Sequence, residues 1–260
     1  MENKNIAVLG CARDVAKHLS RTMQTIKGIT DIFSDYRIFI YENDSKDATM
    51  QILLNYRKQD PKLILKSEPW IARKYPHRTW RIAYARNKLK SLLIESKFTP
   101  DYVIVIDLDD IARNIENGKQ FVIESLKKEN YWDCIFPHPT YDMWCYRTKK
   151  IIYNYWEVLN HFTTYFPNFN QKKYLQEFKK DLVPDENNLC TVLSSFNGIG
   201  LYKYDVYIKG EYSGVNNFYS MIQDINLRSK IQSEECEHVN FHRSLGKDTK
   251  IKVLHNFIYV

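Results

Sequence analysis

Three carboxylates follow the most apolar stretch of the chain. Asp107, Asp109 and Asp110 lie at the end of residues 102–107, a run that predicts a buried strand. In open α/β sheets, ligands bind at the C-terminal ends of the strands. Carboxylates spaced in this way suit a hard divalent cation that also takes phosphate oxygens. We therefore predict a cation site at Asp107 and Asp109. The alternative is an acidic turn that caps the next helix, and it applies best to Asp110.

A second polar cluster follows residues 37–41, which also predict a strand. Its members are Glu42, Asn43, Asp44 and Ser45. Acidic and amide groups at this place can accept hydrogen bonds from a ribose or a base. We therefore assign Glu42 and Asp44 to nucleotide binding. Asp44 or Ser45 could instead cap the helix that follows.

A cationic stretch without acidic residues covers positions 72–90. Its charged members are Arg73, Lys74, Arg78, Arg81, Arg86, Lys88 and Lys90. The usual explanation of such a run is a solvated face, which we expect for Lys88 and Lys90. Arg81 and Arg86 lie among apolar residues and are better suited to bind a diphosphate. Arg13, just after the first expected strand, is a similar candidate.

Acidic residues and two imidazoles crowd the segment 234–242. Glu237, His238 and His242 are its candidates for chemistry. We predict a short strand near 239–242, so that only some of these side chains face one cleft. A structural role is the alternative for each histidine, and His255 is a further candidate ligand.

The strands and helices that must position these residues alternate through the first half of the chain. Apolar runs predict strands at 5–10, 37–41, 62–66, 102–107 and 133–136, and periodic segments predict helices at 13–28, 50–57, 78–96 and 117–128. This alternation indicates an α/β fold with a parallel sheet covered on both faces. Residues 147–190 indicate an aromatic-rich helical insertion, and short strands are expected near 195–203, 239–242 and 252–259. We predict one domain over 1–260. Its first half (1–140) would bind a nucleotide, and its second half (141–260) would complete the site and supply specificity.

Composition limits the class of protein. Hydrophobic residues make up 44% of the chain and the net charge is +7. The first value excludes wholesale disorder, and the second suits nucleic acid, an anionic membrane surface or phosphate-bearing small molecules. The five cysteines are odd in number and form no Cys-x-x-Cys pair, which favours a reducing compartment. We expect a cytoplasmic protein without a signal peptide or membrane span, and peripheral membrane contact stays open.

Taken in order, the motifs resemble those of glycosyltransferases with the GT-A fold. They are Gly10-Cys11-Ala12-Arg13, Glu42-Asn43-Asp44-Ser45, Arg81-Ile82-Ala83-Tyr84-Ala85-Arg86, Asp107-Leu108-Asp109 as the family's D-x-D, Tyr141-Asp142-Met143-Trp144, Phe196-Asn197-Gly198 and Cys236-Glu237-His238. The set is similar to fungal capsule-type mannosyltransferases and to the glycosyltransferase domains of collagen-modifying enzymes.

The resemblance implies a single Rossmann-like domain with a mixed, mostly parallel sheet. It also implies a UDP- or GDP-sugar donor, Mn²⁺ or Mg²⁺, and a glycan or protein acceptor. Asp107 would approach the ribose or the metal, and Asp109 would coordinate the metal. His242 would be the C-terminal metal ligand, with His238 or His255 as substitutes. Glu237 would be the general base. Side chains that would hold the sugar or the acceptor are Asp142, Trp144 and Asn197.

Two other classes of protein remain possible. A haloacid-dehalogenase-type phosphatase also places Asp-x-Asp after an apolar strand and uses its first Asp as nucleophile. Ile111, however, stands where that motif usually has Thr or Val. A non-enzymatic nucleic-acid-binding protein would explain the basic charge, but no nucleic-acid-binding motif is recognised in the sequence.

Overall fold

The computed structural model describes residues 3–109, 114–140, 142–151, 180, 182–216 and 233–260. Asp110 and most of the expected insertion at 147–190 lie outside these residues. Within them, the elements follow one another as β1 (Asn5–Ala12), α1 (Ala16–Thr30), β2 (Asp35–Glu42), α2 (Thr49–Gln59), β3 (Leu63–Ser67), α3 (Ile71–Lys74), α4 (Arg78–Glu95), β4 (Tyr102–Ile106), α5 (Glu116–Leu126), a 3₁₀ turn (Glu129–Tyr131), β5 (Cys134–Pro137), β6 (Leu189–Thr191), β7 (Ile199–Lys203), α8 (Tyr204–Tyr207), α11 (Glu237–Ser244) and β8 (Ile251–Leu254).

The strands form one eight-stranded sheet in the order β3-β2-β1-β4-β7-β5-β8-β6. The first four strands in this order are parallel to one another. β7 is antiparallel to both of its neighbours, β4 and β5, whereas β5 and β8 pair in parallel. The α/β class and the mixed, mostly parallel sheet are thus confirmed, and the division into halves at residue 140 stays a prediction.

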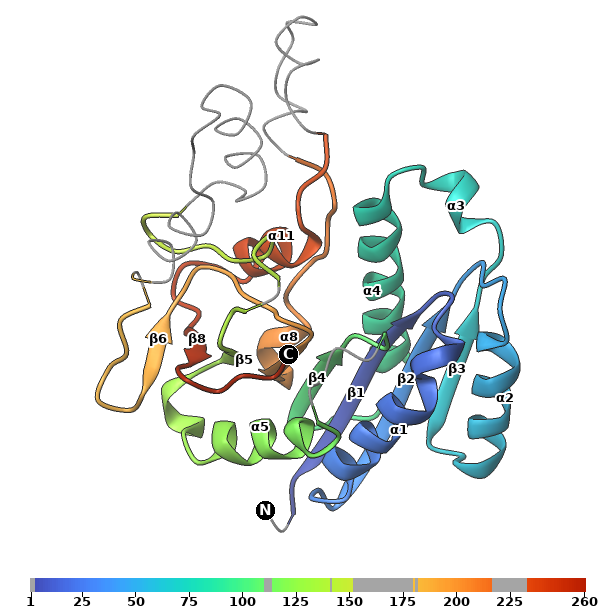
Figure 1. Cartoon of the computed structure of the whole chain (residues 1–260), viewed down its shortest axis with the longest axis horizontal. Helices are drawn as coiled ribbons and strands as arrows, with labels where there is room; N and C mark the ends of the chain where they lie inside the picture. Colours follow the sequence, from blue (N-terminus) through green and yellow to red (C-terminus); the bar gives the residue numbers. More distant parts are fainter. Residues whose placement is uncertain (1–2, 110–113, 141, 152–179, 181, 217–232) are drawn as a thin grey trace, which may run out of the picture.

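Helices cover both faces of the sheet (Figure 1). Alternate residues of the central strands point to opposite faces. On β4, Ile104 and Ile106 join the core beneath α1 and α5, and Val103 and Val105 join the core beneath α4 and α11. Both faces are therefore apolar, which explains why the parallel strands are continuous hydrophobic runs in the sequence.

One of the strand predictions is wrong. Residues 237–244 form the helix α11 and not a strand near 239–242. Its first turn begins after Cys236, and Glu237 to His242 are all buried. Polar side chains occupy the buried positions, so the segment lacks the apolar periodicity that marks a helix in a sequence. The strands expected near 195–203 and 252–259 are confirmed as β7 and β8.

None of the helices in the described residues is long and apolar enough to span a membrane.

Candidate active site

A pocket of ≈ 730 Å³ opens at the C-terminal ends of β1 and β4. Its walls come from α4, the start of α11 and the segment after β5. The residues that line it are Cys11, Ala12, Arg13, Asp14, Val15, His18, Asn43, Arg78, Arg81, Ile82, Ala85, Arg86, Asp107, Leu108, Asp109, Asp142, Trp144, Phe196, Cys236, Glu237 and His238. The structure therefore brings together most of the residues that the sequence indicates for chemistry, from five separate segments.

The loop that carries the two strand-end carboxylates is held by contacts with distant parts of the chain. The Asp107 N–H donates to the carbonyl oxygen of Gly198 at 2.9 Å, and the buried Leu108 side chain anchors the loop below the pocket. A Cβ at Gly10 would lie 2.9 Å from Leu108, so β1 and this loop are in close contact. Asp109 is exposed on the pocket wall.

Arg86 links the strand-end loop to α11. Its Nη2 lies 3.2 Å from Oδ1 of Asp107, and its Nε lies 3.1 Å from Oε1 of Glu237. The side chains of Arg86 and Glu237 are 5% and 7% exposed. Burial alone would lower the pKa of Arg86, but the neighbouring acidic groups raise it well above its usual value. The guanidinium therefore stays charged and positions both carboxylates.

The pocket holds more negative charge than this one guanidinium offsets. Burial, together with the nearby carboxylates Asp109 and Asp142 and opposed by Arg86, raises the pKa of Asp107 to about 7. Burial and the nearby Glu237 raise the pKa of Asp142 to about 6. Carboxylates that resist ionisation in this way favour a bound cation, because a positive charge stabilises the ionised forms.

The carboxylates suit an ion such as Mg²⁺, which needs few protein ligands, better than an ion that is held by protein ligands alone. Among the described residues, Asp107 and Asp109 belong to no group of three close protein ligands. Mg²⁺ commonly binds through one or two carboxylates and completes its shell with substrate phosphates and water. The residues present therefore suit a divalent cation that arrives with a phosphate-bearing molecule.

A cationic group lines the same pocket as these carboxylates. It contains Arg13, which follows β1, and Arg78 and Arg81, which begin α4. Arg81 donates to the carbonyl oxygens of Tyr75 and Pro76, which fixes the direction of its side chain. Lys90 departs from the expected solvated face, because it is 12% exposed and pairs with Glu211.

Rings form the remaining wall. The imidazole of His238 stacks on Phe196 with a centroid separation of 3.7 Å, and Trp144 lines the pocket beside them. Neither ring nitrogen of His238 has a hydrogen-bond partner within the part of the chain that the structure describes. Burial and the nearby Arg86 lower the pKa of His238 well below its usual value, so the ring is neutral.

Three of the expected site residues do not line the pocket. Glu42 accepts hydrogen bonds from Ser45 and Ser67. The carboxylate of Asp44 accepts the N–H groups of Trp70 and Ala72, so it caps the start of α3 and not α2. Asn197 binds the backbone of His138, Thr140 and Asp142.

His242 also lies outside the pocket lining. Its Nδ1 is 2.8 Å from Oγ of Ser194, and its Nε2 is 3.2 Å from the hydroxyl of Tyr202. Both ring nitrogens are thus occupied by the protein, and burial lowers the pKa of His242 to about 3. The ring does not join Asp107 and Asp109, whereas His238 lies in the same pocket as they do. His255 lies elsewhere, 3.5 Å from the thiol of Cys190.

Some residues that line the pocket were not among the expected site residues. Asn43, Arg78 and Cys236 line it although only residues near them in the sequence were selected, and His18 reaches it from α1. His18 stands one helical turn after Asp14, which follows β1. That spacing is a signal that the sequence did contain.

Comparison with known proteins finds similarity to solved structures alone. No family model matches the sequence, and no curated protein does. S. aureus TarS in complex with UDP-GlcNAc is 13% identical over 98% of this chain and 57% of its own, with a TM-score of 0.48. Mannosyltransferase PcManGT from Pyrobaculum calidifontis, in complex with GDP-Man and Mn²⁺, is 10% identical over 96% and 56%, with a TM-score of 0.46. Glucosyl-3-phosphoglycerate synthase from Mycobacterium tuberculosis, in complex with UDP, is 14% identical over 78% and 58%, with a TM-score of 0.37. The chain spans less than two thirds of the length of each of these structures.

Proposed function

We propose that the chain is a nucleotide-sugar glycosyltransferase of the GT-A type. One observation carries the proposal: Asp107 and Asp109 at the end of β4 line one pocket together with Arg13, Arg78 and Arg81. Such an arrangement suits a divalent cation and a diphosphate together. Trp144 and Phe196 add rings beside them, and aromatic faces pack well against the apolar face of a sugar.

The chain's own residues would divide the work in this way. Asp107 and Asp109 would hold Mn²⁺ or Mg²⁺, which when bound offsets negative charge on the leaving diphosphate. Arg13, Arg78 and Arg81 would bind the phosphate oxygens and stabilise the charge that develops on them. Arg86 would keep Asp107 in place, since it is too buried to turn toward a ligand.

Asp142 is the better placed acceptor for the proton of the attacking hydroxyl. Its carboxylate lines the pocket, and the raised pKa of about 6 brings it near the working pH that a general base needs. Glu237, the base expected from the family resemblance, is held by Arg86. We therefore assign Glu237 a positioning role through Arg86.

The two alternatives are less well supported. In the phosphatase, the first carboxylate acts as nucleophile, but here Asp107 is paired with Arg86 and shares the pocket with Arg13, Arg78 and Arg81. For a nucleic-acid-binding protein, the cations would be expected on an open surface, whereas Arg81 is half-buried and Arg86 is buried.

A donor screen tests the proposal directly. UDP- and GDP-sugars should raise the melting temperature of the full chain in the presence of Mn²⁺, and one of the two nucleotides should do so more than the other. EDTA should remove the effect, because the diphosphate then loses the ion that joins it to Asp107 and Asp109. The same nucleotides without Mn²⁺ are the control. If no nucleotide sugar stabilises the protein with Mn²⁺ or with Mg²⁺, the proposed function is wrong.

The pH dependence of transfer separates the two candidate bases. A base acts only in its ionised form, so the rate should fall as the pH drops through about 6. Asp142→Asn should lower kcat by about 10² to 10⁴ and abolish this dependence. Glu237→Gln should retain it. The opposite pattern, with the dependence lost in Glu237→Gln and kept in Asp142→Asn, would reverse the two roles.

A further inference from the structure

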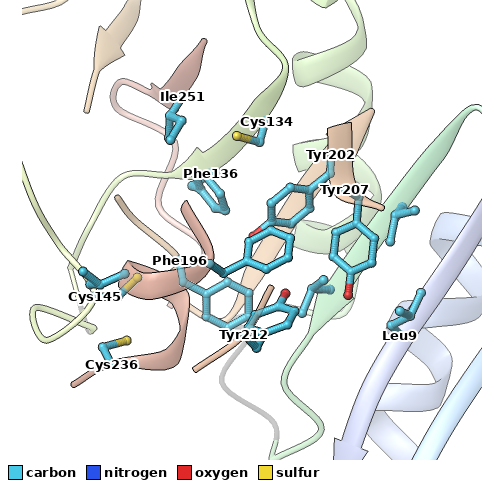
Figure 2. Packing of buried hydrophobic residues seen from close by; sticks show 14 of the residues in the cluster. Leu9, Cys134, Phe136, Cys145, Phe196, Tyr202, Tyr207, Tyr212, Cys236 and Ile251 are labelled. Atoms are coloured by element: carbon cyan, nitrogen blue, oxygen red, sulfur yellow. The ribbon is translucent and has the colours of Figure 1, made fainter. Parts of the chain in front are cut away.

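Two thiols and a carboxylate lie close together at the edge of the active-site pocket. The side-chain ligand atoms of Asp142, Cys145 and Cys236 all lie within 4.8 Å of one another. Both cysteines are free, and they are 0% and 3% exposed. Figure 2 shows them side by side at the edge of the aromatic core, far from Leu9 at its other end.

The backbone around this group is held in place by a buried ion pair. Nη2 of Arg147 lies 2.9 Å from Oε1 of Glu235, and the Arg147 side chain is 2% exposed. The same Oε1 accepts the N–H of Cys236 at 2.9 Å. Nη1 of Arg147 donates to the carbonyl oxygens of Trp144 and Tyr146, which flank Cys145. The pair therefore joins the two segments that carry the thiols.

The side chains of Asp142 and Cys145 each have a supporting contact. Oδ1 of Asp142 accepts the N–H of Cys145 at 3.2 Å. The Cys145 thiol lies 3.3 Å from the Ser194 hydroxyl, which in turn contacts His242 at 2.8 Å. Outer contacts of this kind orient the ligands of metal sites. His242 does not reach the pocket, but it contacts Ser194 and so supports Cys145 through that hydroxyl.

We propose that Asp142, Cys145 and Cys236 form a binding site for a thiophilic divalent cation, with Zn²⁺ as the best fit. Thiolates select Zn²⁺ over Mg²⁺ or Mn²⁺, which prefer oxygen. With Zn–S bonds of about 2.3 Å and tetrahedral geometry, ligand atoms lie roughly 3.5–3.8 Å apart. The present spread of up to 4.8 Å needs a shift of about one ångström. Each thiol releases its proton to solvent as its bond to zinc forms.

The site is open to the active-site pocket on one side. Asp142 and Cys236 both line that pocket, so an ion can enter through it and a water molecule can occupy the fourth position. Zn²⁺ bound here would withdraw the Asp142 carboxylate from the pocket. On the proposed function, the ion should therefore inhibit sugar transfer.

Zinc binding to the full chain under reducing conditions tests the site without any transfer assay. Competition with a chromophoric chelator should give one tightly bound Zn²⁺ per chain. Co²⁺ should produce a thiolate-to-metal charge-transfer absorption. Cys145→Ser and Cys236→Ser should each weaken Zn²⁺ binding at least about 100-fold and remove that absorption. Cys11→Ser, which removes another thiol of the same pocket, should bind as the unchanged chain does.

Circular dichroism of the metal-free variants shows whether they fold. If a serine variant does not fold, Asp142→Asn replaces it as the test, with weaker Zn²⁺ binding and an unchanged thiolate absorption. Binding of equal strength in Cys145→Ser, Cys236→Ser and Cys11→Ser would overturn the proposal, and so would a Co²⁺ complex without thiolate absorption. Because these readouts do not use sugar nucleotides, they can fail while the proposed transferase activity stands.

Discussion

Asp109→Asn should lower kcat/KM for sugar transfer by about three orders of magnitude, or roughly 4 kcal/mol of transition-state stabilisation. Asp109 is exposed on the pocket wall and makes no described ion pair, so the fold does not depend on its charge. Its loss would leave Asp107 as the single strand-end carboxylate for the cation. The melting temperature of the ligand-free protein should therefore change little. Kinetics at saturating Mn²⁺ and thermal melts measure the two effects.

Asp248→Asn is the matched control for that variant. Asp248 is also an exposed aspartate, but it lies outside the pocket lining. Its replacement removes the same charge and should leave both transfer and Mn²⁺-dependent nucleotide binding unchanged. The cation assignment would fail if Asp109→Asn bound the nucleotide sugar with the same affinity and the same dependence on Mn²⁺ as the control.

The α/β core could be predicted because its strands and helices carry distinct apolar periods. Residues 102–106 are buried throughout, as a doubly covered strand requires. On α1, Leu19, Met23 and Ile26 recur at helical spacing and are all buried. In both cases the local sequence pattern and the tertiary burial agree, which is the condition under which such predictions succeed.

The helix α11 could not be predicted on that basis. Its buried positions include Asn240 and His242, which an apolar pattern does not mark. These side chains are stable in the core because their partners come from distant segments. Asn240 donates to the carbonyl oxygens of Ser213 and Val215, and His242 contacts Ser194 and Tyr202. Long-range polar contacts of this kind leave no periodic signal in the sequence.

The site residues also differ in how far the local sequence pattern predicts them. Arg13 and Asp109 follow strand ends, and parallel topology places such residues at one edge of the sheet. Glu42 and Asp44 also follow a strand, yet nearby hydroxyl and N–H groups bind them. Position along the chain could be predicted, whereas the direction of a side chain depends on contacts that only the folded structure shows.

Arg86→Met should destabilise the metal-free protein by about 3–5 kcal/mol, because it leaves a buried carboxylate without its cation. Glu237 is 7% exposed and accepts from Nε of Arg86. The ring of Phe196, with a centroid 5.1 Å from the guanidinium, would lose a cation–π contact as well. Urea unfolding at neutral pH measures the change. In a chain of this size the melting temperature should fall by roughly 10 °C.

Arg243→Met is the control for a lost arginine–glutamate pair. Arg243 is 51% exposed and lies 3.6 Å from Glu235, so its pair should contribute at most about 1 kcal/mol. The double variant Arg86→Met/Glu237→Gln should recover part of the loss, because it removes the stranded carboxylate along with the guanidinium. Equal stabilities of Arg86→Met and Arg243→Met would show that the Arg86 ion pairs do not hold α11 against the end of β4. A double variant less stable than Arg86→Met would show that the buried charge of Glu237 is not the source of the cost.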